Sequence, residues 1–202
     1  MPVGLEGHGE AYFHALTEFL AKTSGFDYVG INVLVHDSNM EEETEMMSLY
    51  SLKENIHLPP FRSKLAGSPC ENVALKSRSV CVFTAKVAQI YPEDDDLVRM
   101  GAQCYLGTPL WDTKTETEEE RPLGVLCMVS RSPLAGKDVP FMTSLLQTFA
   151  LKTAEQLSIY LEERRDKGPV ASVRTVTCQQ MEDDESKPSS SSAPSKSSYY
   201  LT

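Results

Sequence analysis

The chain has 202 residues, 41% of them hydrophobic, which is enough apolar material for one folded domain with its own core. The formal net charge of −10 disfavours nucleic acid and anionic lipid surfaces as partners, because positive charge drives both kinds of binding. Five widely spaced cysteines and four scattered histidines include no C-x-x-C pair and no metal-ligand spacing, so the sequence predicts neither a disulfide framework nor a metal site.

A helix and a β-hairpin are predicted at the start of the chain. Apolar side chains recur at helical spacing over residues 10–23. A strand is predicted over residues 28–36, with β-branched side chains on one face and Asn32 among the residues of the other. We expect the acidic residues 41–43 to form a solvated turn, and residues 46–52 to form the second strand of the hairpin.

The clearest local signal is the start of a helix at Pro69. Ser68 can cap the helix, Pro69 suits the first helical position, and Glu71 can bond back to the amide of the cap. These three residues form the sequence pattern of a capping box. The helix is predicted to run to about Ser77.

The rest of the chain predicts further strands, an acidic bend and a long helix. The predicted elements are a strand over residues 80–83, a bend over 92–96, a helix over 95–100, strands over 103–111 and 122–130, and an amphipathic helix from Asp138 to about Arg165. We expect the carboxylates of the bend to be solvated and the polar residues 112–121 to form an exposed hairpin loop. The strand over 122–130 is apolar on both faces, which favours a central place in the sheet.

Together these elements predict an α+β fold, in which an antiparallel sheet of about five to six strands packs against helices. We assign residues 1–10 to an N-terminal segment, residues 11–165 to the folded domain and residues 166–202 to a disordered tail. The tail is rich in serine and acidic residues and has too few large apolar groups to form a core.

Four motifs narrow the fold further. They are AGSPCE at residues 66–71, YPEDD at 91–95, YLGTPL at 105–110 and RPLGVL at 121–126. In this order and spacing they resemble the GAF domain family, especially the GAF domains found N-terminal to bacterial sensor histidine kinases. The resemblance implies a GAF/PAS-like fold and a sensing or regulatory function in signal transduction.

The resemblance does not select a ligand, because GAF domains bind cyclic nucleotides, bilins, haem, other small metabolites or nothing known. The chain lacks the Asn-Lys-x-x-Phe-Asp-Glu signature of the cyclic-nucleotide-binding members and the Asp-Ile-Pro motif of the bilin binders. Any cofactor therefore remains unknown. If a ligand binds, we expect its pocket to lie between the sheet and residues 65–100. Polar or aromatic side chains there could orient a small molecule or could simply fill the space. The proposed ligand-binding residues are Asn32, Cys70, Tyr91, Tyr105 and Trp111.

Cys70 leaves two interpretations open. At the second position of a capped helix its thiol would feel the positive end of the helix dipole, which favours a reactive thiolate. Alternatively, it is a small apolar side chain that fills space under the helix. One enzymatic branch of the family, the free-methionine-R-sulfoxide reductases, has a cysteine that resembles Cys70 but needs further cysteines before the helix and in the acidic region, which this chain lacks. We therefore expect a non-enzymatic module, with the reductase as the less favoured alternative.

A third hypothesis is a pure interaction module. The sequence contains no recognisable output domain, no signal-peptide pattern and no membrane span, so we expect a cytoplasmic protein that signals through association. The resemblance implies dimerisation through helices. The expected contact is a homodimer through the helix Asp138–Arg165, or a partner signalling protein that binds the same surface.

Overall fold

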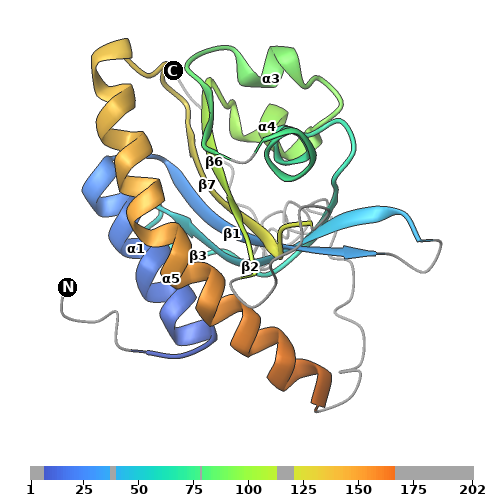
Figure 1. Cartoon of the computed structure of the whole chain (residues 1–202). Helices are drawn as coiled ribbons and strands as arrows, with labels where there is room; N and C mark the ends of the chain where they lie inside the picture. The colour runs from blue at the N-terminus through green and yellow to red at the C-terminus, as the bar shows by residue number, and fades with distance from the viewer. Residues whose placement is uncertain (1–6, 37–39, 78, 113–120, 167–202) are drawn as a thin grey trace, which may run out of the picture.

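An antiparallel sheet of seven strands lies at the centre of the domain (Figure 1). Six strands follow the order β3-β2-β1-β7-β6-β5, and β4 pairs with β2. The strands are β1 (Tyr28–His36), β2 (Glu42–Ser51), β3 (Ile56–His57), β4 (Arg62–Lys64), β5 (Cys81–Phe83), β6 (Cys104–Leu110) and β7 (Gly124–Ser130).

The structure is a computed structural model that describes residues 7–36, 40–77, 79–112 and 121–166. The predictions of an exposed loop and of a disordered C-terminal tail concern mainly residues 113–120 and 167–202, which lie outside the described residues. The α+β fold is confirmed, with one or two more strands than the sequence predicted.

Helices cover both faces of the sheet (Figure 1). On one face lie α1 (Glu10–Ser24) and α5 (Val139–Asp166). The short 3₁₀ turn η2 (Gly136–Asp138) comes directly before α5. On the other face lie α2 (Pro69–Glu71), its π-helical continuation η1 (Asn72–Lys76), α3 (Val87–Ile90) and α4 (Asp95–Met100). In the described part of the chain, none of these helices has the length and hydrophobicity to span a bilayer.

The central strands are buried on both faces because helices lie above and below them. The β-branched side chains of β1, such as Val29 and Ile31, pack in the core under α1 and α5. The opposite face of β1 packs with β2 and β6 side chains under α2 and α4. β7 lies between β1 and β6, as its two apolar faces predicted.

The second strand differs from its prediction. The residues expected to form a solvated turn instead begin β2 at Glu42, which pairs with His36 of β1. The acidic side chains can join the sheet because arginines neutralise them: Glu42 forms an ion pair with Arg121, and Glu43 lies 3.9 Å from Arg62. The very short elements β3, β4 and α3 were not predicted, since they are too short to show a period.

A β-bulge interrupts the pairing of β1 with β2. Ile31 pairs with Ser48, but the next residue, Asn32, pairs with Met46, so that Met47 is the extra residue of β2. Met46 therefore faces α4, whereas Met47 and Ser48 both face α1.

A buried ion-pair cluster joins the end of α5 to the sheet. Glu45 of β2 is 5% exposed and accepts hydrogen bonds from Arg164 of α5 at 2.6 Å and from Arg62 of β4 at 2.7 Å. Burial acts to raise the pKa of Glu45, but the hydrogen bonds from Arg164 and Arg62 outweigh burial and hold the pKa below its ordinary value. The carboxylate thus connects three elements at once.

We predict that Glu45→Gln destabilises the domain by about 2 kcal/mol near neutral pH, because the charged hydrogen bonds to both arginines weaken. The pKa of Glu45 is lowered on folding, so its stabilisation is present above the ordinary value of 4.5 and is lost as the pH falls through the folded-state pKa. Denaturant unfolding across pH should show the two proteins converging in acid. Glu18→Gln is the control, because Glu18 pairs with Lys22 on the surface; an equal effect of both substitutions would contradict the prediction.

Candidate functional site

A small cavity lies between the sheet and the segment that contains α2 and α4. Its volume is about 60 Å³, which is room for a group of a few non-hydrogen atoms. Asn32 of β1, Tyr105 of β6 and Cys127 of β7 line it from the sheet, and Cys70 of α2 and Leu97 of α4 line it from the helices. We call this space the Asn32 cavity.

The start of α2 places Cys70 over the sheet. The Glu71 amide donates to the Ser68 hydroxyl at 3.3 Å, and that hydroxyl donates to the Leu65 carbonyl at 2.7 Å. The carboxylate of Glu71 accepts from the amide of Gly67 at 3.0 Å, one residue before the amide that the capping box predicted. The helix nevertheless starts at Pro69, as predicted, and Cys70 occupies its second position.

Polar groups of the sheet converge on the sulfur of Cys70. The Tyr105 hydroxyl lies 3.2 Å from it, and the Asn32 side-chain amide donates to it at 3.6 Å. A hydrogen bond from the Cys127 thiol lowers the pKa of Cys70, with further lowering by Tyr105 and Asn32, while burial opposes these effects. Donation to Cys70, together with burial, raises the pKa of Cys127 well above its ordinary value. Of the two thiols, Cys70 is therefore the one with the lower pKa.

A glycine makes room for the Tyr105 side chain. A Cβ atom at Gly107 would lie 2.5 Å from the Tyr105 hydroxyl, so the YLGTPL motif requires glycine two residues after the tyrosine. The tyrosine ring is buried, and burial is the main cause that raises its pKa. Tyr105 is thus a neutral hydrogen-bonding group beside the sulfur.

Asn32 leaves one hydrogen-bonding atom unused. Its side chain is 3% exposed, and within the described ranges its amide nitrogen donates to the sulfurs of Cys70 and Cys127, at 3.6 and 3.9 Å. Its amide oxygen has no hydrogen-bond partner among the described residues. Leaving such an acceptor buried and unpaired costs about 1–3 kcal/mol, so this atom needs an explanation.

Two carboxylates of the acidic bend also line the cavity. Asp94 caps α4 by accepting from the Leu97 amide at 3.0 Å, and Asp96 accepts from the Ser63 hydroxyl at 2.8 Å. Burial raises the pKa of Asp94. The expectation of a purely solvated bend is therefore wrong for these two residues, because each has a structural hydrogen bond that turns it toward the domain. The position of Asp94 three residues before Leu97 is the helix-cap signal that could have identified it.

The five residues proposed from the sequence do not all meet. Asn32, Cys70 and Tyr105 line one cavity. Tyr91 is not among the residues that line this cavity. It accepts a hydrogen bond from Asn72, and its ring packs edge-on against that of Phe83, with 5.5 Å between the ring centres. Trp111 is half-buried just after the end of β6 and also lies outside the cavity lining. No group of three or more His, Cys, Asp or Glu side chains suited to a metal ion occurs within the described ranges.

We predict that iodoacetamide labels Cys70 before Cys127, because Cys70 receives hydrogen bonds and is partly exposed, whereas Cys127 donates one and is buried. Cys104 should also react slowly, since burial raises its pKa to about 11. Tyr105→Phe removes one donor to the Cys70 sulfur and should move the alkylation profile of Cys70 to higher pH. Residue-resolved mass spectrometry over a pH series measures all three thiols.

Tyr91→Phe is the matched control, because the hydroxyl of Tyr91 bonds to Asn72 and makes no hydrogen bond to any of the four thiols that the structure describes. A shift of equal size in both tyrosine variants, or faster labelling of Cys127 than of Cys70, would refute the assignment of the lower pKa to Cys70.

Comparisons with solved structures identify the same fold in other proteins. The GAF domain of an Acinetobacter phosphoenolpyruvate-protein phosphotransferase is similar with a TM-score of 0.52 and 13% identity, over 77% of this chain and 85% of that chain. The chromophore-binding domain of the bacteriophytochrome RpBphP3 from R. palustris has a TM-score of 0.51 and 10% identity, over 76% of this chain and 57% of that one. A type II free methionine-R-sulfoxide reductase from Thermoplasma acidophilum has a TM-score of 0.49 and 16% identity, over 75% and 93% of the two chains.

At these identities the structural likeness concerns the fold alone. A search of curated protein sequences finds no match. The sequence model of the GAF domain, however, matches residues 8–161, which include every described strand and nearly all of α5. The chain therefore belongs to the GAF domain family, whose members serve as sensing or regulatory modules in signalling proteins.

Proposed function

We propose that this GAF domain is a regulatory module that binds a small molecule in the Asn32 cavity. The observation that carries the proposal is the amide oxygen of Asn32, which is buried at the cavity without a hydrogen-bond partner among the described residues. A ligand with an N–H or O–H group would offset the desolvation of this oxygen and so bind with a defined orientation.

The walls of the cavity favour a small ligand that carries hydrogen-bond donors. Met46, Phe61 and Met100 supply apolar surface, and the carboxylates of Asp94 and Asp96 supply acceptors. A volume of about 60 Å³ suits the head group of an amine, an amide or an amino acid far better than a bilin or a haem. Ligands of this class are the ones to test first.

In this proposal the domain binds its ligand without catalysing a reaction on it. The side chains that contact the Cys70 sulfur are an amide, a tyrosine hydroxyl and a thiol whose pKa is raised. None of these three groups is a general base near neutral pH, so activation of Cys70 as a nucleophile would rest on its lowered pKa alone. The contacts of Cys70 thus favour a wall of the binding site over a reductase.

We predict that Asn32→Leu abolishes ligand binding and also stabilises the unliganded domain by about 1 kcal/mol, because it replaces a buried unpaired acceptor with an apolar group of similar shape. Thermal melting of the wild-type domain against small amines, amides and amino acids should reveal a ligand. At a hundredfold excess over its dissociation constant, the ligand adds about 2.7 kcal/mol to the stability of the native state.

Ser51→Ala is the matched control for this experiment. The Ser51 hydroxyl is also buried without a partner among the described residues, but Ser51 lies outside the cavity lining. Its substitution should leave the ligand response unchanged. A ligand whose effect survives in Asn32→Leu, or a library of these compounds without a hit, would exclude the proposed site.

A second candidate function is association through α5, and it rests on the exposed apolar side chains of that helix. Phe141 is 57% exposed, Leu151 63% and Ile159 41%. At 3.6 residues per turn, Phe141 and Ile159 fall on the same line along the helix, and Leu151 lies about 80° from it. This stripe faces away from the sheet and suits a second copy of the same helix.

We predict that Leu151→Glu lowers the apparent mass of the protein from dimer to monomer at micromolar concentration, because it places a charge in the apolar stripe. Light scattering coupled to size exclusion measures the mass. Ile90→Glu is the control, since Ile90 is similarly exposed, at 53%, but lies on α3 on the opposite side of the sheet. A monomeric wild-type protein at all concentrations would rule out this association.

A further inference from the structure

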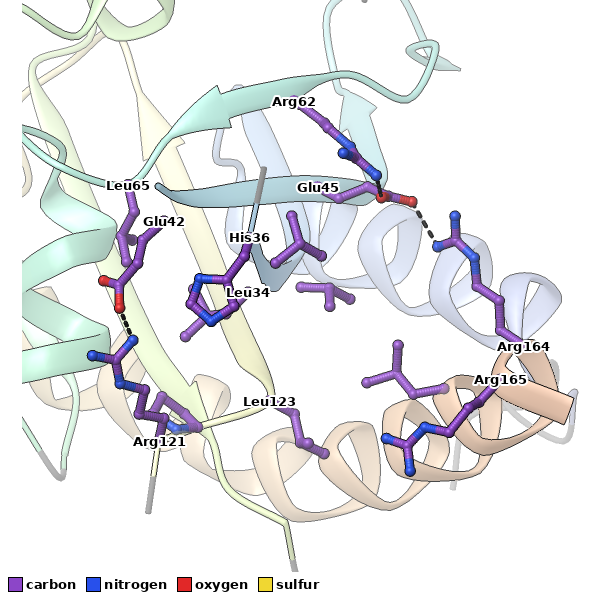
Figure 2. A pocket seen from close by; sticks show the side chains of 14 residues that line it. Leu34, His36, Glu42, Glu45, Arg62, Leu65, Arg121, Leu123, Arg164 and Arg165 are labelled. Atoms are coloured by element: carbon purple, nitrogen blue, oxygen red, sulfur yellow. Dashed lines mark hydrogen bonds and ion pairs between the residues drawn. The ribbon is translucent and has the colours of Figure 1, made fainter. Parts of the chain in front are cut away.

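A second, larger pocket lies at the end of the sheet where α5 terminates (Figure 2). Its volume is about 750 Å³, and no residue that lines it also lines the Asn32 cavity. It is bordered by the end of β1, the start of β2 and the last turn of α5. We call it the arginine groove.

The groove combines an apolar floor with a basic rim. Leu34, Leu123 and Leu161 contribute to the floor. The four arginines of the rim come from different parts of the chain: Arg62 from β4, Arg121 from the segment before β7, and Arg164 and Arg165 from α5. Figure 2 shows Arg62 and Arg164 converging on Glu45 at one side and Arg121 against Glu42 at the other.

Positive charge exceeds negative charge in this groove, although the whole chain has a formal net charge of −10. The lining holds four arginines and two glutamates, Glu42 and Glu45, which leaves an excess of two positive charges. Glu45 accepts hydrogen bonds from Arg62 and Arg164, and Glu42 forms an ion pair with Arg121. Arg165 is exposed and forms no ion pair with any residue in the described part of the chain.

We propose that the arginine groove binds an amphipathic organic anion, with its oxyanion head on Arg165 and its hydrocarbon body along Leu123 and Leu161. A guanidinium presents paired N–H donors that match a carboxylate or a phosphate. The apolar floor favours a ligand with a nonpolar body over a free inorganic ion. Carboxylates and phosphate monoesters share this chemistry, and the experiment separates them.

Binding at this position would act on the end of α5. Arg165 follows directly after Arg164, whose bond to Glu45 holds the last turn of α5 against β2. An anion on Arg165 places negative charge at the C-terminal turn of the helix beside that bond, so the ligand and Glu45 share one basic cluster. In this proposal the anion therefore binds beside the bond that holds the end of α5, and at a site separate from the Asn32 cavity.

The test is binding to the full chain at low ionic strength, measured by titration calorimetry with octanoate and octyl phosphate as probes. We expect at least one of them to bind, and the tighter of the two identifies the head group. Acetate and inorganic phosphate should bind at least about tenfold more weakly than the matching eight-carbon probe, because they lack the apolar body. Octanol and octylammonium should not bind, because neither carries a negative charge.

Variants of two arginines locate the head group. Arg165→Gln should weaken binding of the better probe by at least about tenfold, while Arg121→Gln at the other side of the groove should change it less than about threefold. Arg165 is exposed and forms no ion pair in the described part of the chain, so Arg165→Gln should melt at the wild-type temperature. Arg121→Gln loses the ion pair with Glu42 and should melt slightly lower, by no more than a surface ion pair contributes.

Three results would overturn the proposal: failure of both probes to bind at millimolar concentration, equal binding to the wild type and Arg165→Gln, and equal binding of octanol and octanoate. Loss of octanoate binding in Asn32→Leu would instead place the ligand in the other cavity, which also overturns it. A failure of the Asn32 cavity to bind amines or amino acids leaves this result unaffected, because the two sites share no lining residue.

Discussion

The close pairing of β1 with β7 is the constraint on which the rest of the domain depends. At its end, the carbonyl oxygen of Asn32 would lie 1.9 Å from a Cβ atom at position 124, so only glycine permits the two backbones to approach this closely. The pair forms the middle of the sheet and is covered by helices on both faces. A polar side chain in the middle of these two strands, such as Asn32, is therefore buried, and its hydrogen bonds must come from the domain or from a ligand. In Asn32 the amide nitrogen meets this requirement, but the amide oxygen has no hydrogen-bond partner among the described residues.

Sequence patterns predicted the elements that have either a long period or a specific end signal. β1 was predicted over its observed bounds because nine alternating residues show both of its faces. α4 was predicted over its observed bounds, Asp95–Met100, directly after the acidic bend, and its Asp94 cap is the end signal that marks its start. The start of β2 was missed, since a run of glutamates indicates a solvated turn until its arginine partners are known, and those partners are distant in sequence. Pairing between distant charges leaves no local pattern.

The same limit applies to the candidate sites. All five proposed residues were chosen for polar or aromatic side chains near the helix-covered face of the sheet. Asn32, Cys70 and Tyr105 meet because β1, α2 and β6 surround one cavity. Tyr91 and Trp111 follow the ends of α3 and β6, and they lie outside that cavity. The arginine groove was not predicted, because it combines residues 62, 121, 164 and 165, and no sequence spacing connects them.

The bulge in β2 has a consequence for the two faces of the sheet. Before Met47 the strand alternates in one phase, with Glu45 toward α5 and Met46 toward α4; after it the phase is inverted, with Ser48 toward α1 and Leu49 on the cavity side. If the strand alternated regularly through Met47 instead of bulging there, while its second half kept its packing, the first half would turn over. Glu45 would then face Asp94 and Asp96 in place of Arg62 and Arg164, which would set three carboxylates together in a buried space. The bulge at Met47 thus keeps Glu45 on the face of Arg62 and Arg164 and away from Asp94 and Asp96.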